Sequence, residues 1–85
     1  MNISKAEQRV LHVLAQGGHI RLERDAAGRL VAATCFNRDG HILADCTTSI
    51  FRKLKNRRLI ESKEGSPYRI SYFGRISVRS QADNR

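Results

Sequence analysis

The first eighteen residues most restrict the fold, because they carry a full set of signals for one amphipathic helix. Ser4 and Glu7 form a capping box, in which each side chain can bond a backbone N–H at the helix start. Apolar side chains then recur at helical spacing on one face, at Ala6, Val10, Val13 and Leu14, with Leu11 at its edge. Gly17-Gly18 predicts the helix end, since glycine adopts the left-handed conformation without strain.

The next segment changes to the two-residue alternation of a half-buried β-strand. Ile20 and Leu22 alternate with charged residues, and a turn is expected at residues 25–28 before a returning strand from Leu30 to Asn37. Glu23 and Asp25 fit this turn better than an acid/base pair. Asp39-Gly40 predicts a second tight turn, followed by a short third strand at residues 41–43.

A second helix is expected from about Thr47, with Asp45, Thr47 and Thr48 as alternative N-caps. Its apolar side chains predict an inward face: Ile50, Phe51 and Leu54. Five of the seven residues from Arg52 to Arg58 are basic and none is acidic. Cations suit the negative end of a helix dipole, which accounts for part of this cluster but not for its density.

The remaining chain predicts a wing-like β-hairpin and a short helix. Leu59-Ile60 and residues 68–70 are the expected strands, joined by a polar loop, and Ser71 is the expected cap of the last helix. Gly74 weakens that helix, which would use Tyr72, Phe73 and Ile76; most of the five aromatic residues are expected in the core. The predicted fold is α+β: a small winged-helix-like single domain (residues 1–80) with a polar tail (residues 81–85).

Charge and composition narrow the function classes. Sixteen Lys and Arg oppose eight Asp and Glu, and the net charge of +8 favours a polyanion or an acidic protein surface as partner, the alternative being a solvated surface that serves only solubility. No apolar run approaches the roughly 20 residues of a membrane span, and the start has no secretory pattern, so a cytoplasmic location and no membrane partner are expected.

No residue pattern predicts catalysis. Phosphate-binding loops, zinc-protease motifs and nucleophile elbows do not occur, so no catalytic residue, cofactor or metal site is predicted, although a small basic nuclease stays an open alternative. Cys35 and Cys46 lie eleven apart, which is not a zinc spacing; buried or half-buried free thiols are expected, and His19 and His41 would have to join them to bind metal.

Five segments together carry a resemblance that covers essentially the whole chain: MNISKAEQRVLHVLAQGG, ADCT, KLKNRRLI, PYRI and the closing DNR. In content, order and spacing they resemble the YjhX family of small bacterial proteins. The resemblance implies the toxin half of a toxin–antitoxin pair, which inhibits DNA topoisomerase I by direct binding and is not an enzyme. It also implies an antitoxin similar to acetyltransferases in fold, but it implies no residue-level binding site.

A second resemblance concerns only the C-terminal half. IFRKLKNRRLIESKEGSPYRISYFG is similar to the helix and wing of winged-helix regulators, which makes a DNA-binding transcriptional regulator the alternative function. The chain departs from that pattern before the basic helix, where only residues 44–47 remain for the usual support helix. Without that helix the standard major-groove docking is in doubt, and only weak, non-specific DNA binding is expected.

The outward face of the second helix is the predicted contact surface for the partner. The core does not need this face, and its charge is dense. The predicted partner-binding residues are Arg52, Lys53, Lys55, Asn56 and the nearby Arg57. The polar face of the first helix is the second candidate, through Gln8, Arg9, His12 and Gln16.

Overall fold

A computed structural model of the chain describes residues 3–44 and 46–79. Its elements follow the predicted order: α1 (Lys5–Ala15), β1 (His19–Arg24), β2 (Leu30–Phe36), β3 (Ile42–Leu43), α2 (Thr48–Asn56), β4 (Ile60–Glu61), β5 (Arg69–Ile70) and α3 (Tyr72–Arg79). The predicted mixed α/β class is confirmed. The proposed N-cap Asp45 and the predicted tail at residues 81–85 lie outside the described residues.

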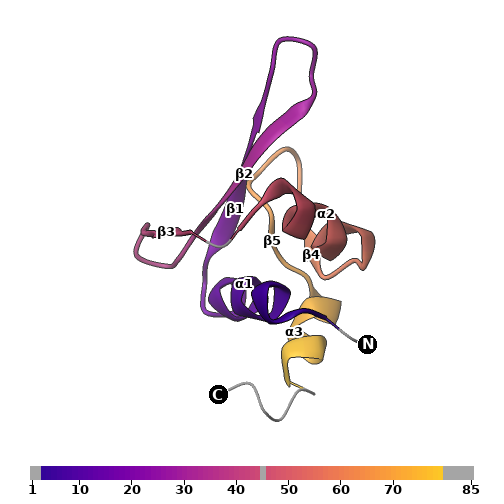
Figure 1. Cartoon of the computed structure of the whole chain (residues 1–85). Helices are drawn as coiled ribbons and strands as arrows, with labels where there is room; N and C mark the ends of the chain where they lie inside the picture. The colour runs from indigo at the N-terminus through magenta and orange to yellow at the C-terminus, as the bar shows by residue number, and fades with distance from the viewer. Residues whose placement is uncertain (1–2, 45, 80–85) are drawn as a thin grey trace.

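Two antiparallel sheets organise the chain. The first has the order β1-β2-β3, and its long β1–β2 hairpin projects beyond the helices (Figure 1). The second is the β4–β5 hairpin, which follows α2 as a wing would. Ile20 and Tyr68 exchange two backbone hydrogen bonds, of 2.8 and 2.9 Å, so the first strand of one sheet is joined to the second sheet.

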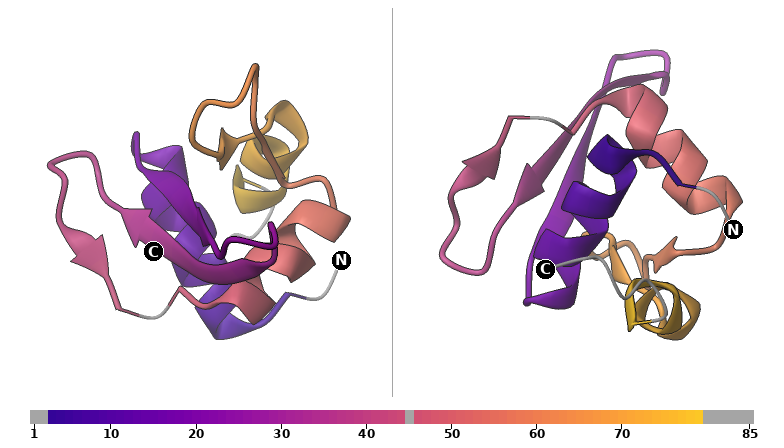
Figure 2. Two further views of the ribbon diagram at one scale, coloured as in Figure 1. Left: turned by 90° about the horizontal axis from the view of Figure 1, so that it is seen from above. Right: turned by 60° about the horizontal axis from the view of Figure 1, so that its bottom comes forward.

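The helices are arranged around these sheets. α2 and α3 lie on the side of the β1–β2 hairpin opposite to β3, and α1 contacts both helices (Figure 2). The described residues between β2 and α2 form turns and β3 but no helix, so the support helix of a winged helix-turn-helix does not occur there. The likeness to a winged helix is therefore confined to α2 and the hairpin that follows it.

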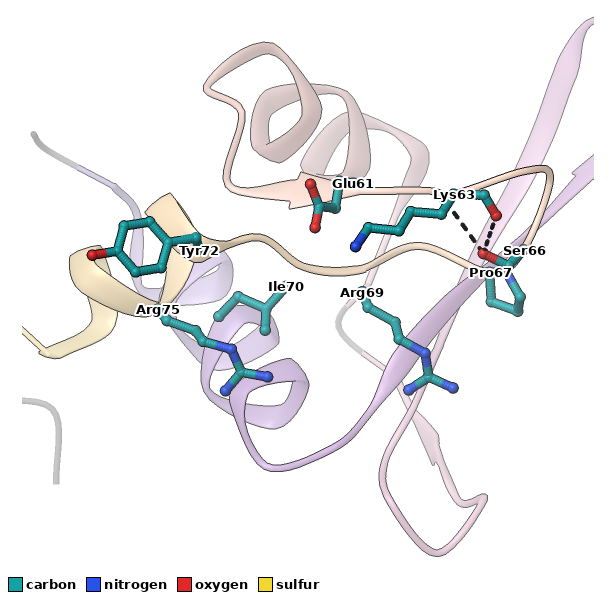
Figure 3. Close-up of a pocket in the computed structure, with 8 residues that line it drawn as sticks. All are labelled: Glu61, Lys63, Ser66, Pro67, Arg69, Ile70, Tyr72 and Arg75. Atoms are coloured by element: carbon teal, nitrogen blue, oxygen red, sulfur yellow. Dashed lines mark hydrogen bonds between the residues drawn. The ribbon is translucent and has the colours of Figure 1, made fainter.

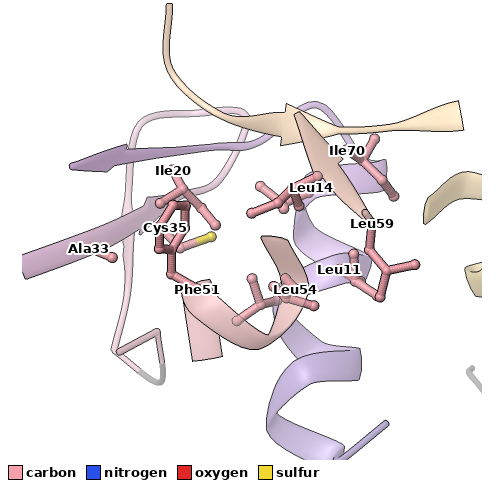
Figure 4. Close-up of a cluster of buried hydrophobic side chains, with 11 residues drawn as sticks. Leu11, Leu14, Ile20, Ala33, Cys35, Phe51, Leu54, Leu59 and Ile70 are labelled. Carbon is pink, nitrogen blue, oxygen red and sulfur yellow. The ribbon is translucent and has the colours of Figure 1, made fainter. Parts of the chain in front are cut away.

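One apolar core is built of buried side chains from α1, α2, β1, β2, β4 and β5 (Figure 4), and Leu43 of β3 and Val78 of α3 pack against it. Its fully or nearly fully buried side chains are Val10, Leu11, Leu14, Ile20, Ala33, Cys35, Phe51, Leu54, Leu59, Ile60 and Ile70. They include two of the three apolar residues expected on the inward face of α2, Phe51 and Leu54, and the α1 residues Val10 and Leu14. The third, Ile50, is only half-buried. The inward face of α1 is rotated from its predicted position, because Leu11 is fully buried whereas Ala6 and Val13 are only half-buried.

The packing of α3 corrects the prediction that its large apolar residues enter the core. Tyr72 is 79% exposed, Phe73 45% and Ile76 42%. The helix instead docks through Gly74, where an added Cβ would come within 2.2 Å of the Leu59 carbonyl oxygen. Besides the low helix propensity that was expected of it, Gly74 permits a close backbone contact, and the flanking large side chains are turned outward.

Ser71 completes this contact between α3 and the segment after α2. As predicted, it caps the helix: its Oγ accepts a hydrogen bond from the Gly74 amide at 2.9 Å. The same hydroxyl donates to the Arg58 carbonyl at 2.7 Å, and the Ser71 amide donates to the Leu59 carbonyl at 3.0 Å. These three bonds and the Gly74 contact form the α3 joint.

Gly74→Ala separates the two effects of this glycine. Alanine would raise helix propensity by about 1 kcal/mol. The added methyl group, however, would meet Leu59 backbone and, at 2.7 Å, the Ile70 side chain. Because backbone cannot move aside cheaply, we expect a net loss of about 1–3 kcal/mol in urea unfolding. A variant as stable as the parent would show that α3 is free to shift.

An ion pair buried at one end ties α1 to α2. The Glu7 carboxylate is 3% exposed, and its Oε2 accepts a hydrogen bond from an Arg57 guanidinium nitrogen at 3.0 Å. The other oxygen, Oε1, accepts from the Ser4 amide at 3.2 Å, while Ser4 Oγ accepts from the Glu7 amide at 3.1 Å. Glu7 therefore has two roles, in the predicted capping box and in a contact between helices.

The two ends of this ion pair should differ in their effect on stability. Arg57→Met leaves a buried carboxylate without its cation, and we expect a loss of about 3 kcal/mol or more. Glu7→Gln keeps a capping-box side chain and leaves only a guanidinium that is 36% exposed, so we expect a smaller loss. Thermal unfolding of both variants and of the double variant measures the coupling; equal losses from the two single changes would contradict this account.

Candidate functional site

The α2 basic face consists of Arg52, Lys53, Lys55 and Asn56, all of which are exposed. The helix is held in place from its other side, where Phe51 and Leu54 are buried. Its start is capped by Thr47, whose Oγ1 accepts a hydrogen bond from the Ile50 amide at 3.2 Å, which selects Thr47 among the predicted caps. The structure thus brings four of the five predicted site residues together on one exposed surface.

Arg57, the fifth predicted residue, is placed differently. Its guanidinium is directed to Glu7, and the side chain is only 36% exposed. It therefore connects the basic face to the body of the domain, and part of its hydrogen-bonding capacity is already used. Across residues 3–44 and 46–79, Arg52, Lys53 and Lys55 form no ion pair, so their charges are available to an acidic partner.

The end of α2 adds one more cation to this region. The Leu59 amide donates to the Leu54 carbonyl and the Arg58 amide to the Lys55 carbonyl, each at 3.0 Å, which is the Schellman pattern of a helix end. Arg58 occupies the left-handed position of this motif with φ of 60°, where glycine is usual. Its side chain is exposed beside the basic face.

The two cysteines form no disulfide, and their burial is as predicted, with Cys35 buried and Cys46 half-buried. The two thiols are close enough to hydrogen-bond to each other. This hydrogen bond and burial raise the pKa of Cys35, whereas the hydrogen bond lowers the pKa of Cys46. Among the described residues, no three His, Cys, Asp or Glu side chains gather as metal ligands would. Asp25 has the predicted turn role, because its Oδ1 accepts from the Ala27 and Arg29 amides at 2.9 Å.

Two features of the surface and its support were missed in the sequence. Glu7 lies with Val10, Leu11 and Leu14 at the spacing of a single helix face, so its position indicated burial. Its charge, however, favoured the opposite prediction of an exposed side chain. The exposed apolar side chains of α3, above all Tyr72, had no such signal, because their orientation depends on the joint at Gly74.

No helix in the described ranges combines the length and apolar character that crossing a membrane requires. No solved structure matches the chain significantly.

Similar proteins cover the chain from end to end. It is 65% identical to a UPF0386 protein of Beijerinckia indica, 60% identical to one of Parvibaculum lavamentivorans and 53% identical to one of Aliivibrio fischeri, and each match covers the whole of both chains. Residues 1–85 also match the YjhX toxin family, described as "Putative toxin of bacterial toxin-antitoxin pair". The chain therefore belongs to the YjhX toxin family.

Proposed function

We propose that this protein is a toxin that binds DNA topoisomerase I and inhibits it through the α2 basic face, without catalysis of its own. The observation that carries the proposal is an exposed, densely cationic helix face that the core does not use. Family membership supports a role in a toxin–antitoxin pair, and hence an antitoxin partner. Inhibition of topoisomerase I and an acetyltransferase-like antitoxin are the finer parts of the proposal.

Charge explains how such a surface could inhibit an enzyme that acts on DNA. Cations fixed on a rigid helix would pair with carboxylates on the enzyme. The bound protein would then compete with DNA for the nearby surface of the enzyme. Arg52 is the strongest candidate for a directed contact, because a guanidinium can bond a carboxylate or a phosphate with two parallel hydrogen bonds. Such a protein would act in the cytoplasm, where its target works on the chromosome.

The alternative function is a DNA-binding transcriptional regulator. The β4–β5 hairpin directly after α2 favours it, because a recognition helix and wing have this order. The absence of a support helix among the described residues before α2 weighs against it, since that helix normally fixes the approach to the DNA backbone.

Charge reversal on the α2 basic face tests the proposed contact. We expect Arg52→Glu with Lys53→Glu to abolish inhibition in a topoisomerase I relaxation assay, because like charges across an interface cost several kcal/mol. Both residues are exposed, so folding should change by no more than about 0.5 kcal/mol. Circular dichroism confirms that the variant is folded.

A matched control changes the net charge equally at exposed positions elsewhere. Lys5→Glu with Arg21→Glu should inhibit as well as the parent protein. Full inhibition by the folded α2 variant would remove this face from the proposal and direct attention to the polar face of α1. Equal loss in both variants would mean that net charge alone inhibits.

Binding to bare DNA separates the two functions. We expect weak, sequence-independent binding whose log–log salt slope is about −0.9 for each phosphate neutralised, with only a few phosphates contacted. Fluorescence anisotropy with duplexes of different sequence, from low to physiological salt, measures the slope. A tight footprint on one sequence at physiological salt would favour the regulator.

A further inference from the structure

Two neighbouring hollows border α3 and together form what we call the α3 groove. The first, with a volume of about 510 Å³, lies between α3 and the β4–β5 hairpin; residues lining it include Glu61, Lys63, Arg69, Ile70, Tyr72 and Arg75 (Figure 3). The second, of about 410 Å³, is lined by Ala15, Tyr72, Arg75, Ile76 and Val78. Tyr72 and Arg75 line both hollows, so the two adjoin each other at these side chains.

The first hollow is cationic. Arg69 and Arg75 point to the same side of the segment that connects β5 to α3, whereas Lys63 extends toward Glu61 (Figure 3). Glu61 is the one acidic side chain in this lining. Within the described part of the chain neither arginine forms an ion pair, so both guanidinium groups can receive carboxylates.

The second hollow is mainly aliphatic. Its lining includes Ala15 of α1 with Ile76 and Val78 of α3, and Arg75 supplies its one charged side chain. The Tyr72 ring stands at the border with the first hollow and is 79% exposed, although an aromatic ring gains from being covered. Such a ring beside an apolar hollow and two cations has the composition of a protein-binding hot spot.

We propose that the α3 groove binds an acidic segment of a partner protein, with carboxylates on Arg69 and Arg75 and an apolar side chain in the second hollow. A sugar–phosphate backbone would satisfy the arginines but carries no apolar side chain to fill the hollow lined by Ala15, Ile76 and Val78. The inference goes beyond the proposed inhibition, because the groove is formed by other elements than the α2 basic face.

A tryptophan-bearing peptide tests this, since the chain contains no tryptophan and excitation at wavelengths that its two tyrosines do not absorb confines the fluorescence to the peptide. The probe is the capped peptide Asp-Glu-Trp-Glu-Asp, and its control is Asn-Gln-Trp-Gln-Asn. Anisotropy titrations use the full chain and three variants: Arg69→Glu with Arg75→Glu, Tyr72→Ala, and Arg52→Glu with Lys53→Glu. The first and third variants change the net charge equally, so they separate a local contact from a global field.

We expect the acidic probe to bind more tightly than its amide control. The groove variant and Tyr72→Ala should each weaken it by about ten-fold or more, whereas the α2 variant should keep most of the affinity. Circular dichroism melts check that each variant is folded, and Tyr72→Phe should retain binding because it keeps the ring.

Four results would overturn the proposal. Equal weakening by the two charge reversals would assign the binding to net charge, and an unchanged affinity of Tyr72→Ala would remove the apolar anchor. An oligonucleotide of equal charge that displaces the peptide completely and binds more tightly would make the groove a phosphate-binding surface. Self-association in sedimentation that is lost in Tyr72→Ala would make a second copy of this chain the occupant. None of these results depends on the relaxation assay, so binding in the α3 groove and inhibition through the α2 basic face are tested separately.

Discussion

The ion pair between Glu7 and Arg57 sets the relative position of the two helices on which the rest of the domain depends. A carboxylate with almost no exposure to water is destabilising unless it is paired, and here Arg57 and the Ser4 amide satisfy it. Because Glu7 lies in the first turn of α1 and Arg57 directly follows α2, the contact aligns the start of one helix with the end of the other. The α2 basic face is held in orientation by this contact and by the core beneath it.

Local signals predicted most of the fold. The capping box, the turn glycines and the alternation of Ile20 and Leu22 act over a few residues, so they can be read in a sequence and are present in the structure. Contacts between distant segments could not be read in this way. Glu7 meets Arg57 fifty positions later, and the orientation of Tyr72 depends on how closely Gly74 approaches the Leu59 backbone. Neither relationship leaves a periodic pattern.

For the candidate site too, features set by local sequence were predicted, whereas those set by distant contacts were not. The exposure of Arg52, Lys53, Lys55 and Asn56 followed from helical periodicity, because the apolar side of α2 determines which side faces water. The role of Arg57 did not follow, since its charge is used within the domain. The sequence did not predict the exposed rings and cations beside α3 either. The molecule therefore presents two cationic surfaces, the α2 basic face and the α3 groove, where the sequence indicated only the first.

At Arg58, a positive charge on the surface is combined with a strained backbone conformation. A left-handed backbone disfavours any side chain by roughly 1 kcal/mol, and glycine would adopt it without strain. Glycine would also delete a cation beside the α2 basic face. The chain therefore holds a charge just after α2, at a position where the backbone would be less strained without a side chain. A change of Arg58 to glycine, the usual residue at a helix end, would relieve this strain but would also weaken the positive electrostatic field around α2.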